Sequence, residues 1–231
     1  MNQYTIIIPV YNEKESIPYL LSSLEIYLNE GNEIIIIDDG STDGSSKILK
    51  NNKRIILIEI NSNRGKGFAI RKGLKKATNN KIVIFDGDLE IHTDEIRKLM
   101  VLDKNNNIFS TMGYRFEDIN PFNSAFDFGN YFFRTFYNFL FKSQQKDVLC
   151  CAKSFYIDVI NDSQLKSKGF DIDIEISYIL SIKKSLPSSL PIQVHYKRRK
   201  VNDGKKLKIS DGWVIFYRIL NLYRNNYLKS S

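Results

Sequence analysis

The sequence contains only two cysteines in 231 residues, Cys150 and Cys151, and they are adjacent. Adjacent cysteines provide no disulfide framework, and they are typical of a reducing compartment and of small buried side chains. The N-terminus lacks a basic region followed by a long apolar stretch, so we expect no secretory signal peptide. Internal repeats and low-complexity tracts are also missing. These absences favour an ordinary cytoplasmic globular protein.

A long uncharged apolar segment is missing as well. The most apolar stretch, residues 122–141, contains Asp127, Arg134 and several asparagines. A membrane-spanning helix needs about 20 predominantly apolar residues, and this stretch is too polar to span a bilayer alone. We therefore expect a soluble protein or one that is peripheral at the cytoplasmic membrane face.

What the chain has in excess is positive charge and aromatic side chains. The formal net charge is +8, and Phe, Tyr and Trp make up 13% of the residues. A basic surface favours anionic partners such as nucleotide phosphates, anionic lipids or nucleic acid, although a merely solvated basic surface has the same composition. The aromatic side chains must be buried or must face something apolar. The length favours one large domain with a C-terminal appendage.

The first hundred residues alternate short isoleucine-rich runs with amphipathic stretches. The runs predict strands buried on both faces at Tyr4–Val10, Glu33–Ile37, Arg54–Ile60 and Lys81–Phe85. The stretches between them predict helices at Glu15–Leu28, Ser45–Lys50, Lys66–Ala77 and His92–Leu102. This alternation predicts an α/β fold with a doubly wound, mostly parallel sheet and helices on both faces.

The rhythm changes after residue 105. We predict a strand at 107–113, an aromatic helix at 122–142, a short buried segment at 147–152, a strand at 190–196, a basic loop at 197–208 and an amphipathic helix at 212–228. Residues 170–184 fit either a strand, because apolar and polar residues alternate, or a helix that begins with acidic residues. We divide the chain into a domain at 1–210, with halves 1–105 and 106–210, and a C-terminal helix within 211–231.

Polar residues follow three of the predicted strands. Asp38 and Asp39 follow the second, residues 61–66 follow the third, and residues 86–88, Asp-Gly-Asp, follow the fourth. Ligands of open α/β sheets bind beyond the carboxyl ends of the strands, so we expect these residues to meet at one edge. Two carboxylates on a tight turn also present hard oxygens to Mg²⁺ or Mn²⁺, although the same residues are common in plain turns.

Four segments carry a resemblance to a known family. Residues 8–13 (IPVYNE), 35–45 (IIIDDGSTDGS), 63–67 (NRGKG) and 85–90 (FDGDLE) resemble the opening of family 2 glycosyltransferases of the GT-A fold. Residues 147–153 (DVLCCAK) resemble the D-x-x-C-G-x-K element of polyprenyl-phosphate sugar synthases, such as dolichyl-phosphate mannose and glucose synthases. Residues 172–176 (IDIEI) and 204–208 (GKKLK) also match that subgroup.

Two departures bear on the acceptor. Cys151 and Ala152 stand where the subgroup prefers glycine and an aromatic residue. Many members also carry C-terminal transmembrane helices, and no such segment occurs in these residues.

The resemblance implies a donor site. A UDP- or GDP-sugar would be bound by the residues at Pro9, Tyr11, Glu13, Asp38, Asp39, Arg64, Lys66, Asp86 and Gly87. The metal, Mg²⁺ or Mn²⁺, would be held by Asp86, Asp88 and Glu90, where Glu90 replaces a common glutamine. Glycines next to Arg64 and Lys66 allow close backbone approach, and a helix N-terminus attracts phosphate, although basic residues there are often only solvated.

The resemblance also implies the chemistry, which is inverting displacement at the anomeric carbon, with Asp88 and Asp173 as the catalytic residues. A hydroxyl acceptor needs a base, and Asp173 is the candidate. A lipid phosphate is already an anion at neutral pH and needs cations instead, for which Arg198 and Arg199 are the candidates.

Three hypotheses follow. The first is a transferase of hexose to polyprenyl phosphate, and the second is a transferase to a sugar hydroxyl of a surface polysaccharide. The third is a nucleotide-binding or nucleic-acid-binding protein of the same fold without turnover. No aromatic RNA-binding motif is present, so we expect no nucleic acid partner.

Overall fold

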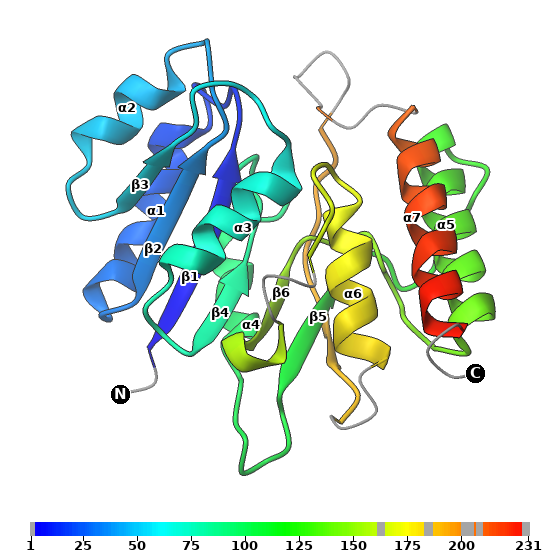
Figure 1. The fold of residues 1–231 in the computed structure, drawn as a ribbon. Helices are drawn as coiled ribbons and strands as arrows, with labels where there is room; N and C mark the ends of the chain where they lie inside the picture. Colours follow the sequence, from blue (N-terminus) through cyan, green and yellow to red (C-terminus); the bar gives the residue numbers. More distant parts are fainter. Residues whose placement is uncertain (1–2, 161–164, 183–186, 200–205, 207–209, 228–231) are drawn as a thin grey trace.

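The computed structural model describes residues 3–160, 165–182, 187–199, 206 and 210–227 (Figure 1). Its strands are β1 (Tyr4–Val10), β2 (Glu33–Asp38), β3 (Ile56–Glu59), β4 (Lys81–Ile84), β5 (Ser110–Tyr114), β6 (Lys153–Tyr156) and β7 (Leu190–Gln193). They form one sheet in the order β3-β2-β1-β4-β6-β5-β7. β6 is antiparallel to both of its neighbours, and every other pairing in the sheet is parallel. The predicted mostly parallel α/β sheet is confirmed.

Helices cover both faces of this sheet. They are α1 (Ile17–Asn29), α2 (Ser45–Asn51), α3 (Lys66–Lys76), α4 (Ile96–Leu99), α5 (Ala125–Phe141), α6 (Ile172–Ile182) and α7 (Asp211–Tyr227), with short 3₁₀ turns at Thr93–Glu95 and Ile157–Val159. β5, β6 and β7 extend the sheet that β1–β4 begin, so residues on both sides of position 105 contribute to one sheet. None of the described helices is both long and apolar enough to cross a membrane.

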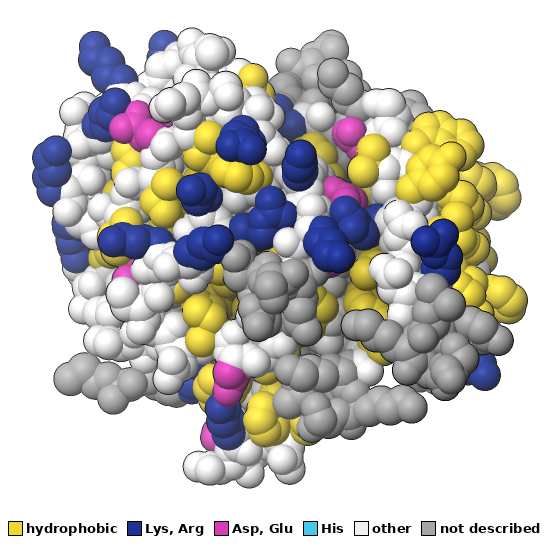
Figure 2. Space-filling model, in the orientation of Figure 1, with side chains coloured by type: hydrophobic (Ala, Val, Ile, Leu, Met, Phe, Trp, Pro, Cys, Tyr) yellow, Lys and Arg dark blue, Asp and Glu magenta, His cyan; other side chains and the backbone are white. Residues whose placement is uncertain are grey.

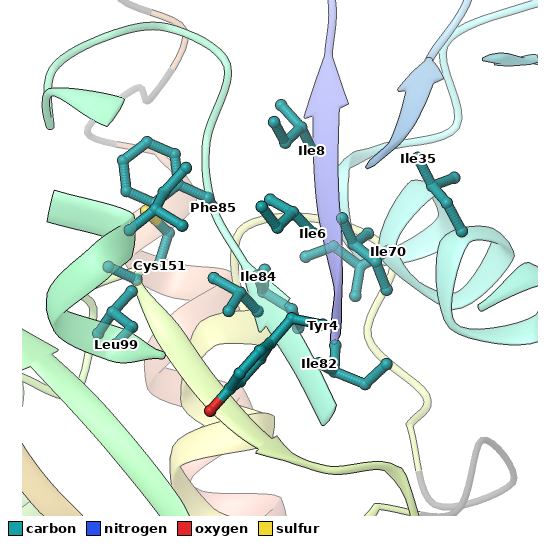
Figure 3. Packing of buried hydrophobic residues seen from close by; sticks show 14 of the residues in the cluster. Tyr4, Ile6, Ile8, Ile35, Ile70, Ile82, Ile84, Phe85, Leu99 and Cys151 are labelled. Atoms are coloured by element: carbon teal, nitrogen blue, oxygen red, sulfur yellow. The ribbon is translucent and has the colours of Figure 1, made fainter. Parts of the chain in front are cut away.

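Isoleucine builds the centre of the molecule. Ile6, Ile7 and Ile8 of β1 are fully buried, as are Ile35 to Ile37 of β2. Consecutive buried residues are expected where helices lie on both faces of a strand. These side chains belong to one core cluster with Ile82 and Ile84 of β4 and Ile70 of α3, and Figure 3 shows Ile6, Ile8 and Ile35 of this cluster. Each such side chain contributes about 1.5–3 kcal/mol relative to an exposed one, which makes the sheet a rigid support for the loops at its edge.

The open assignment of residues 170–184 is settled as a helix. In α6 the apolar residues Ile172, Ile174 and Ile176 are buried, and so are Asp173 and Glu175 between them. The apparent strand alternation therefore does not separate an inner from an outer face. The buried acids have partners, since Glu175 accepts hydrogen bonds from the amides of Lys166 (2.9 Å) and Ser167 (2.8 Å).

Three sequence predictions need correction. The strand β6 was not expected, because four residues, Lys-Ser-Phe-Tyr, are too few for a period to show. The prediction of a short buried segment at 147–152, just before β6, is confirmed, and this segment forms neither a strand nor a helix. The helix expected at 92–102 is a 3₁₀ turn followed by the single turn of α4, and the strand expected at 54–60 is confined to β3.

A second, smaller core joins α5, α6 and α7. Its buried members are Phe133, Tyr137, Phe141, Val148, Ile174, Ile215 and Ile219. α7 contributes Ile215 and Ile219 from one face, so the predicted terminal amphipathic helix packs on the protein along that face. Figure 1 shows α5 and α7 side by side at the edge of the molecule beyond α6.

Candidate active site

A cavity of about 1000 Å³ lies at the carboxyl edge of the sheet, where the sequence predicts a ligand site. One part is polar and includes Glu13, Asp39, Lys66, Asp86, Asp88 and Asp173. The other part is aromatic and includes Phe126, Phe128, Phe132 and Phe133 of α5 with Trp213 and Phe216 of α7. The cavity is thus continuous from the ends of the strands to the two outer helices.

The Asp-Gly-Asp turn follows β4 and forms part of the cavity wall. A Cβ atom at Gly87 would lie 2.5 Å from Val10 Cγ1, so only glycine lets this turn pack against β1. Burial, together with the charges of Asp86 and Glu90, raises the pKa of Asp88 to about 7. Asp86 keeps 27% of its side chain exposed. The turn therefore presents closely spaced acidic oxygens to the cavity.

Lys66 connects this turn to α6. Its Nζ lies 2.9 Å from an oxygen of Asp86 and 2.9 Å from Asp173 Oδ2, and only 8% of its side chain is exposed. Burial by itself lowers the pKa of Lys66, but the charges of Asp173 and Asp86 outweigh it and hold that pKa well above its ordinary value. The other oxygen of Asp173, Oδ1, is buried without a hydrogen-bond partner among the described residues.

The first amides of α3 are hydrogen-bonded to the protein's own backbone. Gly65 has a φ of +92°, and a Cβ there would lie 2.4 Å from the carbonyl oxygen of Lys168. That oxygen accepts hydrogen bonds from the amides of Gly67 (2.7 Å) and Phe68 (3.2 Å). The expectation that this helix N-terminus receives phosphate is therefore not supported at these two amides. The guanidinium of Arg64 lies 4.1 Å from the ring centre of Phe68 and is absent from the cavity wall.

Asp38 and Asp39 have different surroundings. Asp38 Oδ1 accepts a hydrogen bond from the amide of Ser41 (3.0 Å), which closes its own loop. Asp39 accepts from the amides of Arg64 (2.9 Å) and Gly65 (2.7 Å) and so ties the loop after β2 to the loop before α3. Burial raises the pKa of Asp39 despite these bonds. Asp39 lines the cavity and Asp38 does not.

The segment after β7 crosses the polar part of the cavity. The Tyr196 hydroxyl donates to Glu90 Oε2 (2.9 Å), and the Arg199 amide donates to Glu90 Oε1 (2.9 Å). The Arg199 side chain bonds Glu13 (2.8 Å) and Ser16 (2.6 Å). Both oxygens of Glu90, which the sequence assigns to a metal, thus bond this segment, and Arg199 is held against the loop after β1.

Two arginines stand between the polar and aromatic parts of the cavity. Arg198 makes a two-point ion pair with Asp127 (2.5 and 2.9 Å), and Arg115 pairs with the buried Asp147 (2.7 and 3.0 Å). Both guanidinium groups lie near the Tyr196 ring, at 5.2 Å for Arg115 and 6.0 Å for Arg198. Arg115 was not among the site residues predicted from the sequence. Its signal was its place directly after β5, at the same carboxyl edge as the other site residues.

Comparison with known proteins identifies the family. Residues 5–162 match the family model described as glycosyl transferase family 2. The chain belongs to this family.

Two relatives illustrate the range of similarity within family 2. The undecaprenyl-phosphate 4-deoxy-4-formamido-L-arabinose transferase of Proteus mirabilis is 35% identical over 108 residues, which are 43% of this chain and 33% of that protein. The glycosyltransferase AglJ of Haloferax volcanii is 28% identical over 224 residues, 95% of this chain and 70% of that protein. The match to the Proteus transferase spans only about a third of that protein.

Solved structures confirm the expected GT-A fold. The mannosyl-3-phosphoglycerate synthase of Rubrobacter xylanophilus superposes with a TM-score of 0.74 at 11% identity, covering 99% of this chain and 74% of that one. The glucosyl-3-phosphoglycerate synthase of Mycobacterium tuberculosis, solved with Mn²⁺, UDP-glucose and phosphoglyceric acid, gives 0.73 at 14% identity, covering 96% and 79%. At this level of identity the likeness concerns the fold.

In this family 2 protein the cavity brings together most of the residues expected to bind the donor and the metal. These are Pro9, Tyr11, Glu13, Asp39, Lys66, Asp86, Gly87, Asp88 and Glu90, with Asp173 and Arg198 from the expected catalytic and acceptor sets. Asp38, Arg64 and Arg199 are not among the lining residues. The Gly-Lys-Lys-Leu-Lys element at 204–208 lies outside the described residues except for Lys206, which donates to the Asn12 carbonyl (2.9 Å).

Proposed function

We propose that this protein transfers a hexose from a UDP- or GDP-sugar to a polyprenyl phosphate, with inversion at the anomeric carbon and with Mg²⁺ or Mn²⁺ as the cofactor. The observation that carries the proposal is the two-part cavity, in which carboxylates and Lys66 at one side continue into aromatic side chains at the other. A phosphate joined to a long isoprenoid chain needs a site of this composition. The undecaprenyl-phosphate acceptor named for the Proteus relative supports the same assignment.

The donor would occupy the polar part. Asp39 and the loops after β1 and β4 surround it, and the sheet supports all three. Among the described residues no three acidic, histidine or cysteine side chains converge on one point as a metal cluster. Asp86 and Asp88 alone fit the usual way of binding Mg²⁺, which takes one or two carboxylates and completes its shell with substrate phosphates. Mn²⁺ and UDP in the solved glucosyl-3-phosphoglycerate synthase support this reading.

The reaction would be a single displacement. An oxygen of the lipid phosphate attacks the anomeric carbon while the bond from that carbon to the diphosphate oxygen breaks, and the electron pair leaves with the nucleoside diphosphate. A bound divalent cation would supply Lewis-acid stabilisation of the departing diphosphate. Lys66, already placed beside Asp86, adds positive charge next to the same group.

The acceptor phosphate would lie at the junction of the two parts. Arg115 and Arg198 are the cations there, and arginine suits phosphate because its planar donors bind two oxygens at once. Each guanidinium is already oriented by an aspartate, so little freedom is lost when phosphate binds. Arg199 bonds Glu13 instead, so its contribution to this phosphate would require that contact to break.

Asp173 distinguishes the lipid acceptor from a hydroxyl acceptor. A hydroxyl must lose its proton during attack, and a carboxylate in the cavity could accept it. Asp173 is paired with Lys66 at 2.9 Å, and this contact orients its carboxylate. With a phosphate acceptor no proton has to be removed, and Asp173 would serve to position Lys66.

The test is a donor and acceptor panel. The protein is incubated with Mn²⁺ and each of several UDP- and GDP-sugars, with a short-chain polyprenyl phosphate, with a glycan, or with neither, and nucleotide diphosphate release is followed. We expect release that depends on the lipid phosphate. Release with glycan alone would favour the hydroxyl acceptor. Donor binding by calorimetry with no release under any of these conditions would indicate a nucleotide-binding protein without turnover.

Replacement of Asp88 tests the role of the Asp-Gly-Asp turn in the same assay. Asp88→Asn should lower turnover at least about a hundredfold, because loss of a metal ligand removes several kcal/mol of stabilisation of the leaving group. Asp94→Asn is the control, since 79% of that side chain is exposed and it lies outside the cavity. Unchanged turnover in Asp88→Asn would remove this residue from the metal site.

A further inference from the structure

The outer faces of α5 and α7 carry large aromatic side chains that are open to solvent. Phe139 is 79% exposed, Trp213 68%, Tyr217 62% and Phe128 57%. In Figure 2 hydrophobic atoms gather along the edge of the molecule that these helices form. Single exposed apolar residues are ordinary, but several on two neighbouring helices mark an interaction surface. We call this surface the α5–α7 face.

The aromatic rings of the α5–α7 face form a connected array. Phe132 stacks between Phe128 (6.3 Å) and Phe136 (5.6 Å) along α5, and Phe136 stacks on Phe216 of α7 (5.2 Å). Trp213 meets Phe216 edge to face at 6.3 Å. The two helices therefore present one broad apolar face and do not act as separate amphipathic helices.

The charge on these helices has one sign at the exposed positions. Among the described residues of α5 and α7, no exposed position carries Asp or Glu. Asp127 is buried against Arg198, and Asp211 is the first residue of α7. Exposed basic side chains lie at the ends, with Arg224 in the last turn of α7 and Lys142 directly after α5. An aromatic face with basic ends and a net charge of +8 complements an anionic, apolar partner.

The α5–α7 face is continuous with the cavity. Phe128, Phe132 and Trp213 are exposed on the face and also line the cavity. Whatever covers the face therefore lies at the aromatic mouth of the site. A folded protein bound to this face would block the aromatic opening of the cavity. A lipid surface bound there would let lipid molecules enter the cavity.

We infer that the α5–α7 face docks on an anionic lipid bilayer, with both helices lying in the headgroup region and the cavity opening toward the acyl chains. Trp and Tyr are favoured at this depth because an apolar ring carries a polar atom that stays hydrated, and Phe contributes an apolar ring. Lys and Arg contact anionic headgroups. The inference deepens the proposed function and rests on it for the identity of the lipid acceptor. Docking itself can be measured without any turnover.

Trp213 is the single tryptophan of the chain, and it lies on the α5–α7 face, so it reports docking directly. The full chain is titrated with vesicles of phosphatidylcholine mixed with phosphatidylglycerol and with vesicles of phosphatidylcholine alone. We expect Trp213 emission to shift to the blue with the anionic vesicles and to be quenched by lipids brominated near the headgroup. Binding should weaken on the neutral vesicles and at high salt.

The variant that tests the face keeps the reporter and avoids the cavity wall. Phe139→Ser with Tyr217→Ser removes two exposed rings that do not line the cavity, and it should weaken vesicle binding about tenfold or more. The matched control, Tyr19→Ser with Ile26→Ser, changes side chains that are 51% and 54% exposed on α1. It should bind vesicles as the unchanged protein does.

Two results would overturn the inference. One is unshifted Trp213 emission with anionic vesicles, and the other is a dimer, seen by light scattering, that forms through Phe139 and Tyr217 and binds no vesicles. Failure of the proposed function looks different, since vesicle binding would persist while no donor released nucleotide diphosphate with lipid phosphate. Conversely, a protein that turns over a water-soluble short-chain polyprenyl phosphate but binds no vesicles would contradict docking through the α5–α7 face and would support the proposed function.

Discussion

At the carboxyl edge of the sheet the polar side chains of the cavity bond other parts of the chain, whereas along α5 and α7 large rings are left open to solvent. Lys66, Asp39 and Glu90 each join loops that are distant in sequence. The aromatic rings contact mainly one another. The polar part is therefore preorganised and costly to disturb, while the aromatic part gains its free energy only when a partner covers it.

Of the changes considered, replacement of Lys66 in the polar part of the cavity should lower the stability of the fold most. Lys66→Met leaves Asp86 and Asp173 without their shared cation, and loss of one partner of a buried ion pair costs about 3–5 kcal/mol. For a chain of this length that lowers Tm by roughly 6–20 °C. Scanning calorimetry measures the change, with the exposed Lys76→Met as the control. Equal Tm values for the two variants would show that the pairing does not stabilise the fold.

Arg198 lies where the polar and aromatic parts of the cavity meet. Arg198→Ala should lower kcat/KM for the polyprenyl phosphate about 10- to 100-fold through loss of charge-assisted hydrogen bonds, with the KM for the donor unchanged. Steady-state kinetics with each substrate varied in turn tests this. Lys146→Ala removes an exposed cation paired with Glu117 and should leave both constants as they are. If only the KM for the donor changed, Arg198 would belong to the donor part of the cavity and not to the acceptor site.

A smaller effect concerns pH in the absence of metal. The pKa of Asp88 is about 7 in the folded protein, against about 3.9 in an unfolded chain, so the folded state binds the proton more tightly. The stability that this proton contributes is present below about pH 4 and is lost as pH rises to about 7.

Asp88→Asn carries no such proton, so in EDTA its Tm should rise relative to the unchanged protein between about pH 4 and about pH 7. Thermal melts across that range measure the difference. A difference that stays constant with pH would contradict the raised pKa of Asp88.

The smallest effect is expected at the start of α5. Ser124 caps this helix, accepting from the amide of Asp127 (3.1 Å) and donating to its carboxylate (2.6 Å). Ser124→Ala should cost about 1 kcal/mol and lower Tm by about 2–4 °C. Ser22→Ala, at an exposed interior position of α1, should leave Tm unchanged or slightly higher. A similar drop in both variants would mean that the cap contributes nothing.

Sequence patterns were sufficient to predict β1, β2 and β4 and the edge of the sheet at which polar residues gather. Runs such as Ile34–Ile37 are buried whichever helices cover them, and parallel strands bring their carboxyl ends together by topology. The Asp-Gly-Asp turn and the family resemblance followed from residues adjacent in the chain. Local pattern was sufficient because neighbouring residues share one environment.

Contacts between side chains that are distant in the sequence depend on the folded structure. Lys66 and Asp173 are separated by 107 positions, and Arg199 and Glu13 by 186, so no local period relates them. The same limit hid β6, whose four residues form a strand because β4 and β5 offer hydrogen bonds on both sides. It also left α6 ambiguous, since a helix enclosed by neighbours buries its acids as well as its isoleucines. Pairing of distant groups is a property of packing, and packing exists only once the chain has folded.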